Sequence, residues 1–314
     1  MKPLIEVNDL TKKYGDRYAI KNINFSISAG EVIGLLGPNG AGKSTTMKIL
    51  SGLLSPTKGV AKICGYDVFE NPIEVKKRIG YLPENPPLYL DMTILDYLKY
   101  VADLKKVETR FKVSNIEEAL TKTNLLEVRN RLIKNLSKGF KQRVGIAQTL
   151  VSKPELLILD EPTVGLDPKQ VIEIRELIQS LKGQHTVILS THILSEVEAT
   201  CDRVFIIHKG QLVAKDSLQN LQNSRLQKNQ TVFIKIKEAF DFMSKFKILT
   251  SVLDVQTKDF MHYILKTNNA QMMFAGIFEI LSQQNSFLMS YQVEESNLEN
   301  IFLELTYNAD QKGL

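Results

Sequence analysis

The first 215 residues contain short apolar runs that alternate with stretches of helical spacing. Apolar runs of about four to eight residues bounded by turn signals are typical of buried strands. We predict strands at residues 5–10, 23–27, 32–36, 79–82, 156–159, 187–189 and 204–207. Strands that alternate with helices predict an α/β domain with a largely parallel core sheet.

Residues from about 86 to 150 break this alternation. Apolar residues recur at helical spacing within 96–104, and a second helical pattern covers 117–126. Positions three and four apart lie on one face of a helix, so each segment can bury an apolar stripe. We therefore predict a helical subdomain inserted into the sheet domain.

A polar run rich in Asn and Gln at 219–230 marks the best domain boundary. It divides a first domain, 1–218, from a second, 231–314. The order strand, helix, strand, strand, helix, strand predicts a small α+β domain of ferredoxin-like type. These elements are expected at 232–236, 240–248, 252–257, 262–266, 272–281 and 287–293, with a last helix at 298–305.

A glycine-rich segment follows the apolar run at 32–36 and precedes a helical pattern at 46–50. The segment consists of Gly37, Pro38, Asn39, Gly40, Ala41, Gly42, Lys43, Ser44 and Thr45. Strand, glycine-rich loop and helix form the context of a phosphate-binding P-loop. The glycines let backbone N–H groups surround a phosphate, and the helix dipole favours the same anion. We expect Lys43 to reach the β- and γ-phosphates and the Ser44 hydroxyl to bind Mg²⁺.

A second motif completes the predicted phosphate site. The apolar run 156–159 ends in Asp160 and Glu161. A carboxylate at the end of a buried strand suits Mg²⁺, so we assign this role to Asp160. Glu161 lies one residue later, outside the strand, where it can accept a proton from an attacking water.

Three further segments are interpreted in the context of this site. Residues 136–143 contain Ser137 and Gly139, which would open a helix and expose N–H donors to an anion, although the segment alone predicts only a capped surface helix. Gly165 to Pro168 form a turn before a helix at 169–181. His192 follows the strand 187–189; an isolated His is often structural, but its place near the phosphate site favours contact with the γ-phosphate.

The composition fits a soluble protein with a large core: 314 residues, 43% apolar and 24% charged. No run of 18 apolar residues occurs, and the N-terminus lacks the apolar core of a signal peptide. Cys64 and Cys201 lie far apart and in no metal-ligand spacing, which predicts a reduced, cytosolic protein.

The net charge is +5, with lysines scattered along the chain. The simplest interpretation is a solvated surface; attraction to an anionic membrane leaflet is the sharper alternative. No basic stripe with interleaved aromatic residues stands out, so nucleic-acid binding is not expected.

The ordered set of motifs resembles the ATP-binding subunits of ABC transporters. Residues 37–45 resemble Walker A, 156–161 Walker B, 136–143 the signature, 165–168 the D-loop and His192 the switch histidine. Tyr14 matches the aromatic residue that stacks on adenine. The resemblance implies an ATPase of P-loop NTPase fold, with a RecA-like core, an antiparallel strand layer and a helical subdomain, and with ATP and Mg²⁺ as cofactors.

Two positions depart from the family pattern. Most members have Gln where this chain has Glu84; a carboxylate also ligates Mg²⁺ but adds negative charge beside Asp160 and Glu161. Lys138 replaces the first Gly of the usual signature, whereas Ser137 and Gly139 remain. Both variants, and the segment 81–89, resemble the branch that serves ABC-2-type exporters, including gliding-motility and multidrug-export ATPases.

The resemblance also implies partners. The chain supplies one P-loop and one signature, so a head-to-tail homodimer is expected, with Ser137 and Gly139 contacting ATP in trans. Glu161, His192 and Lys43 would be catalytic, and Ser44, Glu84 and Asp160 would hold Mg²⁺. A polytopic membrane permease would dock near Asn85–Tyr89, although a simple connecting loop remains the alternative. The subunit would be cytoplasmic and peripheral on the inner face of the membrane.

The competing function is a soluble ABC ATPase that acts on nucleic acid or ribosomes. Such proteins carry two cassettes or long coiled-coil or zinc insertions, whereas only 94 positions separate Lys43 from Ser137 here, with no Cys/His cluster. A regulatory or clamping role for the second domain is compatible with either function. The transported substrate is not encoded in these motifs.

Overall fold

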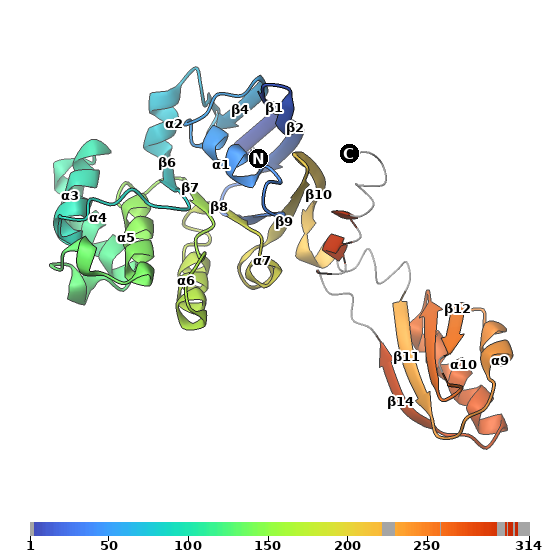
Figure 1. Cartoon of the computed structure of the whole chain (residues 1–314). Coiled ribbons are helices and arrows are strands. Elements are labelled where there is room, and N and C mark those ends of the chain that lie inside the picture. Colours follow the sequence, from blue (N-terminus) through green and yellow to red (C-terminus); the bar gives the residue numbers. More distant parts are fainter. Residues whose placement is uncertain are drawn as a thin grey trace. The chain divides into compact units, whose positions relative to one another are not determined.

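The computed structural model describes residues 3–221, 230–257, 259–293, 299, 301–303, 305 and 306. They fall into two compact units that divide after Ser217, and the second unit runs to residue 304 (Figure 1). Most of the predicted linker, 222–229, lies outside the described residues, as do several residues of the predicted last helix, 298–305.

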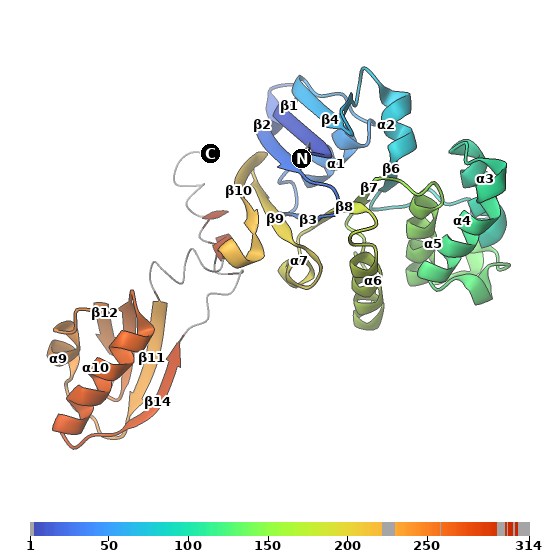
Figure 2. The same cartoon turned by 180° about the vertical axis from the view of Figure 1, so that it is seen from behind.

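The first unit contains two sheets and the helices around them, seen from both sides in Figures 1 and 2. Its strands are β1 (Ile5–Tyr14), β2 (Arg17–Ile27), β3 (Val32–Leu36), β4 (Lys58–Ile63), β5 (Tyr66–Asp67), β6 (Ile79–Leu82), β7 (Leu156–Asp160), β8 (Thr186–Thr191), β9 (Arg203–His208) and β10 (Gln211–Ser217). Its helices are α1 (Lys43–Leu50), α2 (Pro72–Arg78), α3 (Ile94–Leu104), α4 (Thr109–Lys122), α5 (Lys138–Leu150), α6 (Pro168–Ser180) and α7 (Leu194–Thr200), with short 3₁₀ turns at Leu126–Val128 and Ile133–Asn135. Each strand predicted in this unit lies within an observed strand.

The core sheet has the order β10-β9-β3-β8-β7-β6, and only the β9–β10 pairing is antiparallel. The predicted largely parallel sheet is therefore confirmed. β3, β8 and β7 are neighbours and run parallel, so the loops that follow them all lie at the carboxyl edge of the sheet. The P-loop after β3 and the acidic pair at the end of β7 are brought together there.

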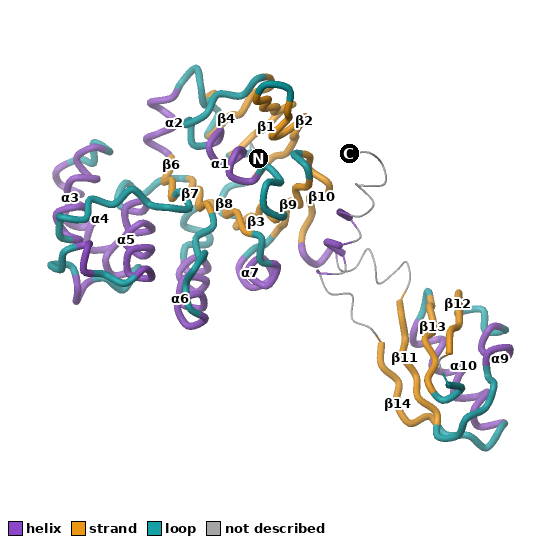
Figure 3. Tube along the Cα trace, viewed as in Figure 1, coloured by secondary structure: helices purple, strands orange, loops and turns teal. Residues whose placement is uncertain are grey.

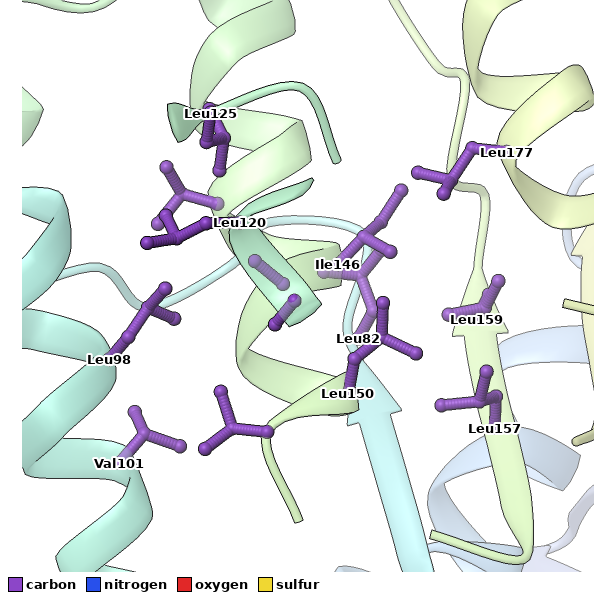
Figure 4. Packing of buried hydrophobic residues seen from close by; sticks show 14 of the residues in the cluster. Leu82, Leu98, Val101, Leu120, Leu125, Ile146, Leu150, Leu157, Leu159 and Leu177 are labelled. Carbon is purple, nitrogen blue, oxygen red and sulfur yellow. The ribbon is translucent and has the colours of Figure 1, made fainter. Parts of the chain in front are cut away.

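Side-chain alternation along β7 assigns its two faces to different layers. Leu156 and Ile158 pack in a cluster with α1 and the antiparallel strands, whereas Leu157 and Leu159 pack in a cluster with α5 and α6. Figure 4 shows the second cluster, in which Ile146 and Leu150 of α5 lie between Leu98 and Leu120 on one side and Leu157 and Leu159 of β7 on the other. One strand thus joins the layer that contains α1 and the antiparallel strands to the helical subdomain.

The second sheet is antiparallel, with the order β2-β1-β4-β5, and it matches the strand layer that the resemblance implies (Figure 3). β1 extends to Tyr14, beyond the predicted end at residue 10. The hydrophobic pattern did not predict β4, because its first three residues are exposed and only Ala61 and Ile63 are buried.

The helical subdomain is formed by α3, α4 and α5. The predicted helix 117–126 is wrong in its bounds, since α4 covers Thr109–Lys122. Asn124 has a φ of 54°, a left-handed conformation that ends the helix. Leu125, beyond this break, is buried in the core rather than carried on the helix.

The second unit contains β11 (Gln230–Ile236), α9 (Met243–Lys247), β12 (Val252–Thr257), β13 (His262–Thr267), α10 (Ala270–Gln283) and β14 (Leu288–Val293). Its antiparallel sheet has the order β12-β13-β11-β14, as the predicted ferredoxin-like element order requires. α9 is shorter than predicted, because the Tyr263 hydroxyl donates to Phe240 O (2.5 Å) and accepts from Phe242 N (3.0 Å), holding both residues outside the helix.

Candidate nucleotide-binding site

The glycines of the P-loop are required by its backbone. Gly40 and Gly42 have φ values of 77° and 109°, which favour glycine. A Cβ on Gly37 would lie 2.3 Å from Ile207 O, so this residue needs glycine for lack of space. Gly42 caps α1 without a side-chain hydrogen bond, which leaves the first-turn N–H groups directed at the loop. The loop is therefore built to receive an anion.

Lys43 places a buried positive charge within this loop. Its Nζ donates to Gly37 O (2.8 Å) and Pro38 O (3.3 Å). The same nitrogen lies 3.2 Å from Glu161 Oε1, so the lysine also pairs with the acidic motif. The ammonium is thus anchored at the position where a polyphosphate would meet both motifs.

Asp160 gathers two hydroxyl groups at the end of β7. Ser44 donates to Asp160 Oδ1 (3.2 Å), and Ser190 of β8 donates to the same oxygen (2.6 Å). Asp160 is only 2% exposed. Among the described residues, no group of three or more His, Cys, Asp or Glu side chains is arranged so that it could hold a metal ion by itself. A carboxylate with a neighbouring hydroxyl still fits Mg²⁺, which is commonly bound by one or two carboxylates together with water and substrate phosphates.

Glu161 is held in an uncommon backbone conformation. Its φ is 49°, and its N–H donates to Ser190 Oγ (3.0 Å) and Ser190 O (3.2 Å). Such conformations persist where the surroundings fix them, and they concentrate at functional sites. The carboxylate lies between Lys43 and His192, with Oε2 3.0 Å from His192 Nδ1.

A second layer of hydrogen bonds supports this pair. Glu196 of α7 is buried and accepts hydrogen bonds from Thr191 (2.6 Å) and Thr163. Thr191 Oγ1 in turn accepts from Ile193 N (3.0 Å). The residues on both sides of His192 are therefore fixed, which orients the histidine towards Glu161. The sequence reasoning missed Ser190 and Glu196, although Ser190-Thr191 directly before His192 offered a signal.

The P-loop, Glu161 and His192 line an open cleft of about 1080 Å³. The predicted residues that line it are Tyr14, Pro38, Asn39, Gly40, Ala41, Gly42, Lys43, Ser44, Thr45, Glu84, Glu161 and His192. Residues that the sequence reasoning did not single out complete the lining: Arg17, Tyr18, Ala19, Val164, His208 and Lys209. Arg17 and Lys209 add cationic side chains to Lys43, which suits a polyphosphate ligand.

Ser137 and Gly139 are not among the residues that line this cleft. Ser137 caps α5, where its hydroxyl accepts from Phe140 N (3.4 Å). Gly139 lies in the first turn, and a Cβ there would lie 2.5 Å from the side chain of Gln170. The signature thus forms a helix start, as predicted, at a place separate from the cleft of the same chain.

Comparison with known proteins agrees with this geometry. The family model described as ABC transporter matches residues 20–164. The chain is 34% identical over 311 residues to the uncharacterised ABC transporter ATP-binding protein YhcH of Bacillus subtilis, covering 98% of this chain and 97% of that protein. It is 41% identical over 224 residues to the bacitracin transport ATP-binding protein BcrA of Bacillus licheniformis, covering 71% and 72%.

Solved structures give the same result. One is a dimeric post-hydrolysis state of an ATP-binding cassette bound to ADP and Pi, with a TM-score of 0.62, 27% identity, and coverage of 68% of this chain and 98% of that one. Within the described residues, every helix is too short or too polar to cross a membrane. By its motifs, its site geometry and its relatives, the chain belongs to the ATP-binding subunits of ABC transporters, and it is an ATPase.

Proposed function

We propose that this chain powers export through a separate membrane subunit, as a head-to-tail homodimer that binds two molecules of Mg²⁺-ATP. The observation that carries the dimer is the separation of Ser137 and Gly139 from the cleft that holds Lys43. A chain with one P-loop and one signature completes its site when a second copy supplies the missing helix start. The dimeric cassette among the structural relatives supports this arrangement.

The proposal assigns a role to each main residue of the predicted site. Lys43 and the P-loop N–H groups neutralise the phosphates, and Tyr14 stacks on adenine. Ser44, Asp160 and Glu84 hold Mg²⁺, which neutralises phosphate charge when bound. Glu161 accepts the proton of the attacking water, and His192 stabilises charge at the γ-phosphate.

The contacts of Lys43 suggest how ATP prepares the base. Lys43 Nζ is shared between Gly37 O and Glu161 Oε1. The polyphosphate of ATP carries several negative charges, whereas the Glu161 carboxylate carries one, so the polyphosphate competes with Glu161 for the ammonium. Entry of ATP therefore draws Lys43 away from Glu161 and frees the carboxylate to accept a proton. His192 remains beside it to keep it oriented.

The permease would dock at residues 85–89, between the core sheet and the helical subdomain. Leu88 packs partly into the helical cluster, whereas Tyr89 is 53% exposed. The Tyr89 ring packs against Tyr97 and Tyr100 of α3, with centroids 6.1 and 5.4 Å away. The subunit would then lie peripherally on the cytoplasmic face of the membrane. The relative named for bacitracin transport supports a transport role, and the resemblance to the ABC-2-type branch favours export.

The test is to purify the tagged chain from detergent-solubilised membranes and to identify what accompanies it at stoichiometric ratio. A polytopic membrane protein would support the proposal, and its own sequence would narrow the substrate. Recovery from the soluble fraction alone, or with ribosomes or DNA, would overturn it.

Tyr89→Ala sharpens this test. We expect the variant to lose the membrane protein and keep its basal ATPase activity, because Tyr89 does not line the cleft. Ile172→Ala is the matched control, since Ile172 is equally exposed, at 54%, but lies on α6. Equal loss of the partner in both variants would contradict docking at residues 85–89.

A further inference from the structure

The hydroxyl of Tyr81 on β6 is buried and has no hydrogen-bond partner among the described residues. Buried polar groups are nearly always paired, and an exception often marks a bound water or ion. Leaving such a group unsatisfied costs about 1–3 kcal/mol. The residues around Tyr81 should therefore show which group its hydroxyl binds.

The strand register places Tyr81 on the face of the sheet to which Asp160 also points. β6 and β7 are parallel neighbours, and Tyr81 pairs with Ile158. Asp160 follows Ile158 by two residues, so it points to the same face. Tyr81 and Ile158 share the hydrophobic cluster that packs against α1, the helix that carries Ser44. The Tyr81 side chain and the Asp160 carboxylate therefore occupy one face at adjacent strands.

Electrostatics agrees with this placement. Burial, together with the negative charge of Asp160, raises the pKa of Tyr81 to about 12. The phenol therefore keeps its proton at neutral pH and is available as a donor.

Asp160 has an oxygen that matches this donor. Both hydrogen bonds to Asp160, from Ser44 and Ser190, end on Oδ1. Oδ2 accepts none within the described part of the chain. The Tyr81 hydroxyl and Asp160 Oδ2 thus belong to side chains on one face of adjacent strands, and no direct hydrogen bond joins them among the described residues. A water molecule can bridge such a pair.

We propose that Tyr81 is a positioning residue for the magnesium site: its hydroxyl holds, together with Asp160 Oδ2, one of the waters that the Mg²⁺ ion retains. This inference rests on the proposed binding of Mg²⁺-ATP. Mg²⁺ loses its water reluctantly, so partners that fix its waters also fix the ion. Groups that orient metal ligands from the second layer typically contribute about 10–100-fold to metal affinity.

The test compares Tyr81→Phe with Tyr66→Phe in the full chain. Both changes remove only a hydroxyl, and both tyrosines pack against the same hydrophobic cluster, but Tyr66 lies on β5 of the other sheet. The probe is Mn²⁺, whose binding to the complex with a slowly hydrolysed ATP analogue is followed by electron paramagnetic resonance. Nucleotide affinity in the presence of a chelator provides the second readout.

We expect Tyr81→Phe to weaken Mn²⁺ binding about 10-fold. Nucleotide affinity without metal should be unchanged, and Tyr66→Phe should match the wild type in both readouts. In an Asp160→Asn background, Tyr81→Phe should have no further effect on Mn²⁺, because the two groups act through one water.

Equal Mn²⁺ affinity in Tyr81→Phe and wild type would overturn the inference and leave the proposed function intact. A parallel loss of metal-free nucleotide affinity would overturn it too, since the hydroxyl would then act on the loop rather than on the ion. A wild type that binds nucleotide without any Mn²⁺ dependence would overturn both proposals.

Discussion

Two histidines at opposite ends of β8 occupy very different surroundings. His185 precedes the strand and is 8% exposed, with Nδ1 2.6 Å from Pro154 O. His192 follows the strand; its side chain is 40% exposed and lines the cleft beside Glu161. The same residue type is thus buried at the amino edge of the parallel sheet and lines the cleft at the carboxyl edge.

The reason lies in what each edge of the sheet presents. At the carboxyl edge, the P-loop, Asp160 and Ser190 follow neighbouring strands and converge. At the amino edge, His185 packs beside the helical subdomain, near Glu118 and Lys122 of α4. Changes at the carboxyl edge should therefore alter binding or turnover, whereas changes at the amino edge should alter stability.

The largest effect is expected for Glu161→Gln. The amide cannot accept the proton of an attacking water, so hydrolysis should fall by about 10²–10⁴-fold while ATP binding is kept. The trapped complex should run as a dimer in gel filtration with ATP, and phosphate release should be nearly absent. Unchanged turnover would mean that Glu161 is not the general base. It would also contradict the division of the sheet into a functional carboxyl edge and a stabilising amino edge.

His192→Ala should lower turnover by about 10²–10³-fold, the usual cost of removing one group that stabilises charge in the transition state. The histidine lies 3.0 Å from Glu161 and is partly exposed, so the free energy of unfolding should change little. Steady-state ATPase assays and thermal melting check the two parts. A lower melting temperature with normal turnover would mean that His192 is structural, like His185.

Lys43→Ala should weaken ATP binding by about 10–100-fold, because hydrogen bonds to a charged group contribute about 1.5–3 kcal/mol each. Isothermal titration calorimetry gives Kd directly. Lys48→Ala is the matched control, since Lys48 lies in the last turn of the same helix and does not line the cleft. Normal affinity in Lys43→Ala would argue against the phosphate cradle.

Much of the carboxyl edge could be predicted, because contiguous motifs encode it. Gly37 to Thr45 and the Asp160-Glu161 pair are each local in sequence, and the alternating pattern placed them after buried strands. Arg17 and Lys209 could not be found in this way, since they reach the cleft from segments outside these motifs that only the folded chain brings together. Their residue types are common on any surface.

The missed elements have a related cause. β10 is only partly buried, so its alternation is weak, and the hydrophobic pattern carries little information there. α2 did offer a local signal, Asn71 followed by Pro72 at the first helical position. The start of α9 was misplaced because Tyr263, distant in sequence, holds Phe240 and Phe242 by hydrogen bonds.

The smallest effect is expected at the amino edge, for His185→Gln. Burial lowers the pKa of His185 below its ordinary value of 6.5, so the unfolded chain binds a proton more readily than the folded chain does. The stability that neutral His185 contributes is therefore complete above pH 6.5 and declines as the pH falls below it. Chemical denaturation at pH 7.5 and pH 5.5 should show a smaller pH dependence of the free energy of unfolding in His185→Gln than in the wild type.

ATPase activity at pH 7.5 should be equal in both proteins, because His185 lies at the edge of the sheet opposite the cleft. A loss of turnover without a change in this pH dependence would mean that the two ends of β8 are not divided between stability and chemistry.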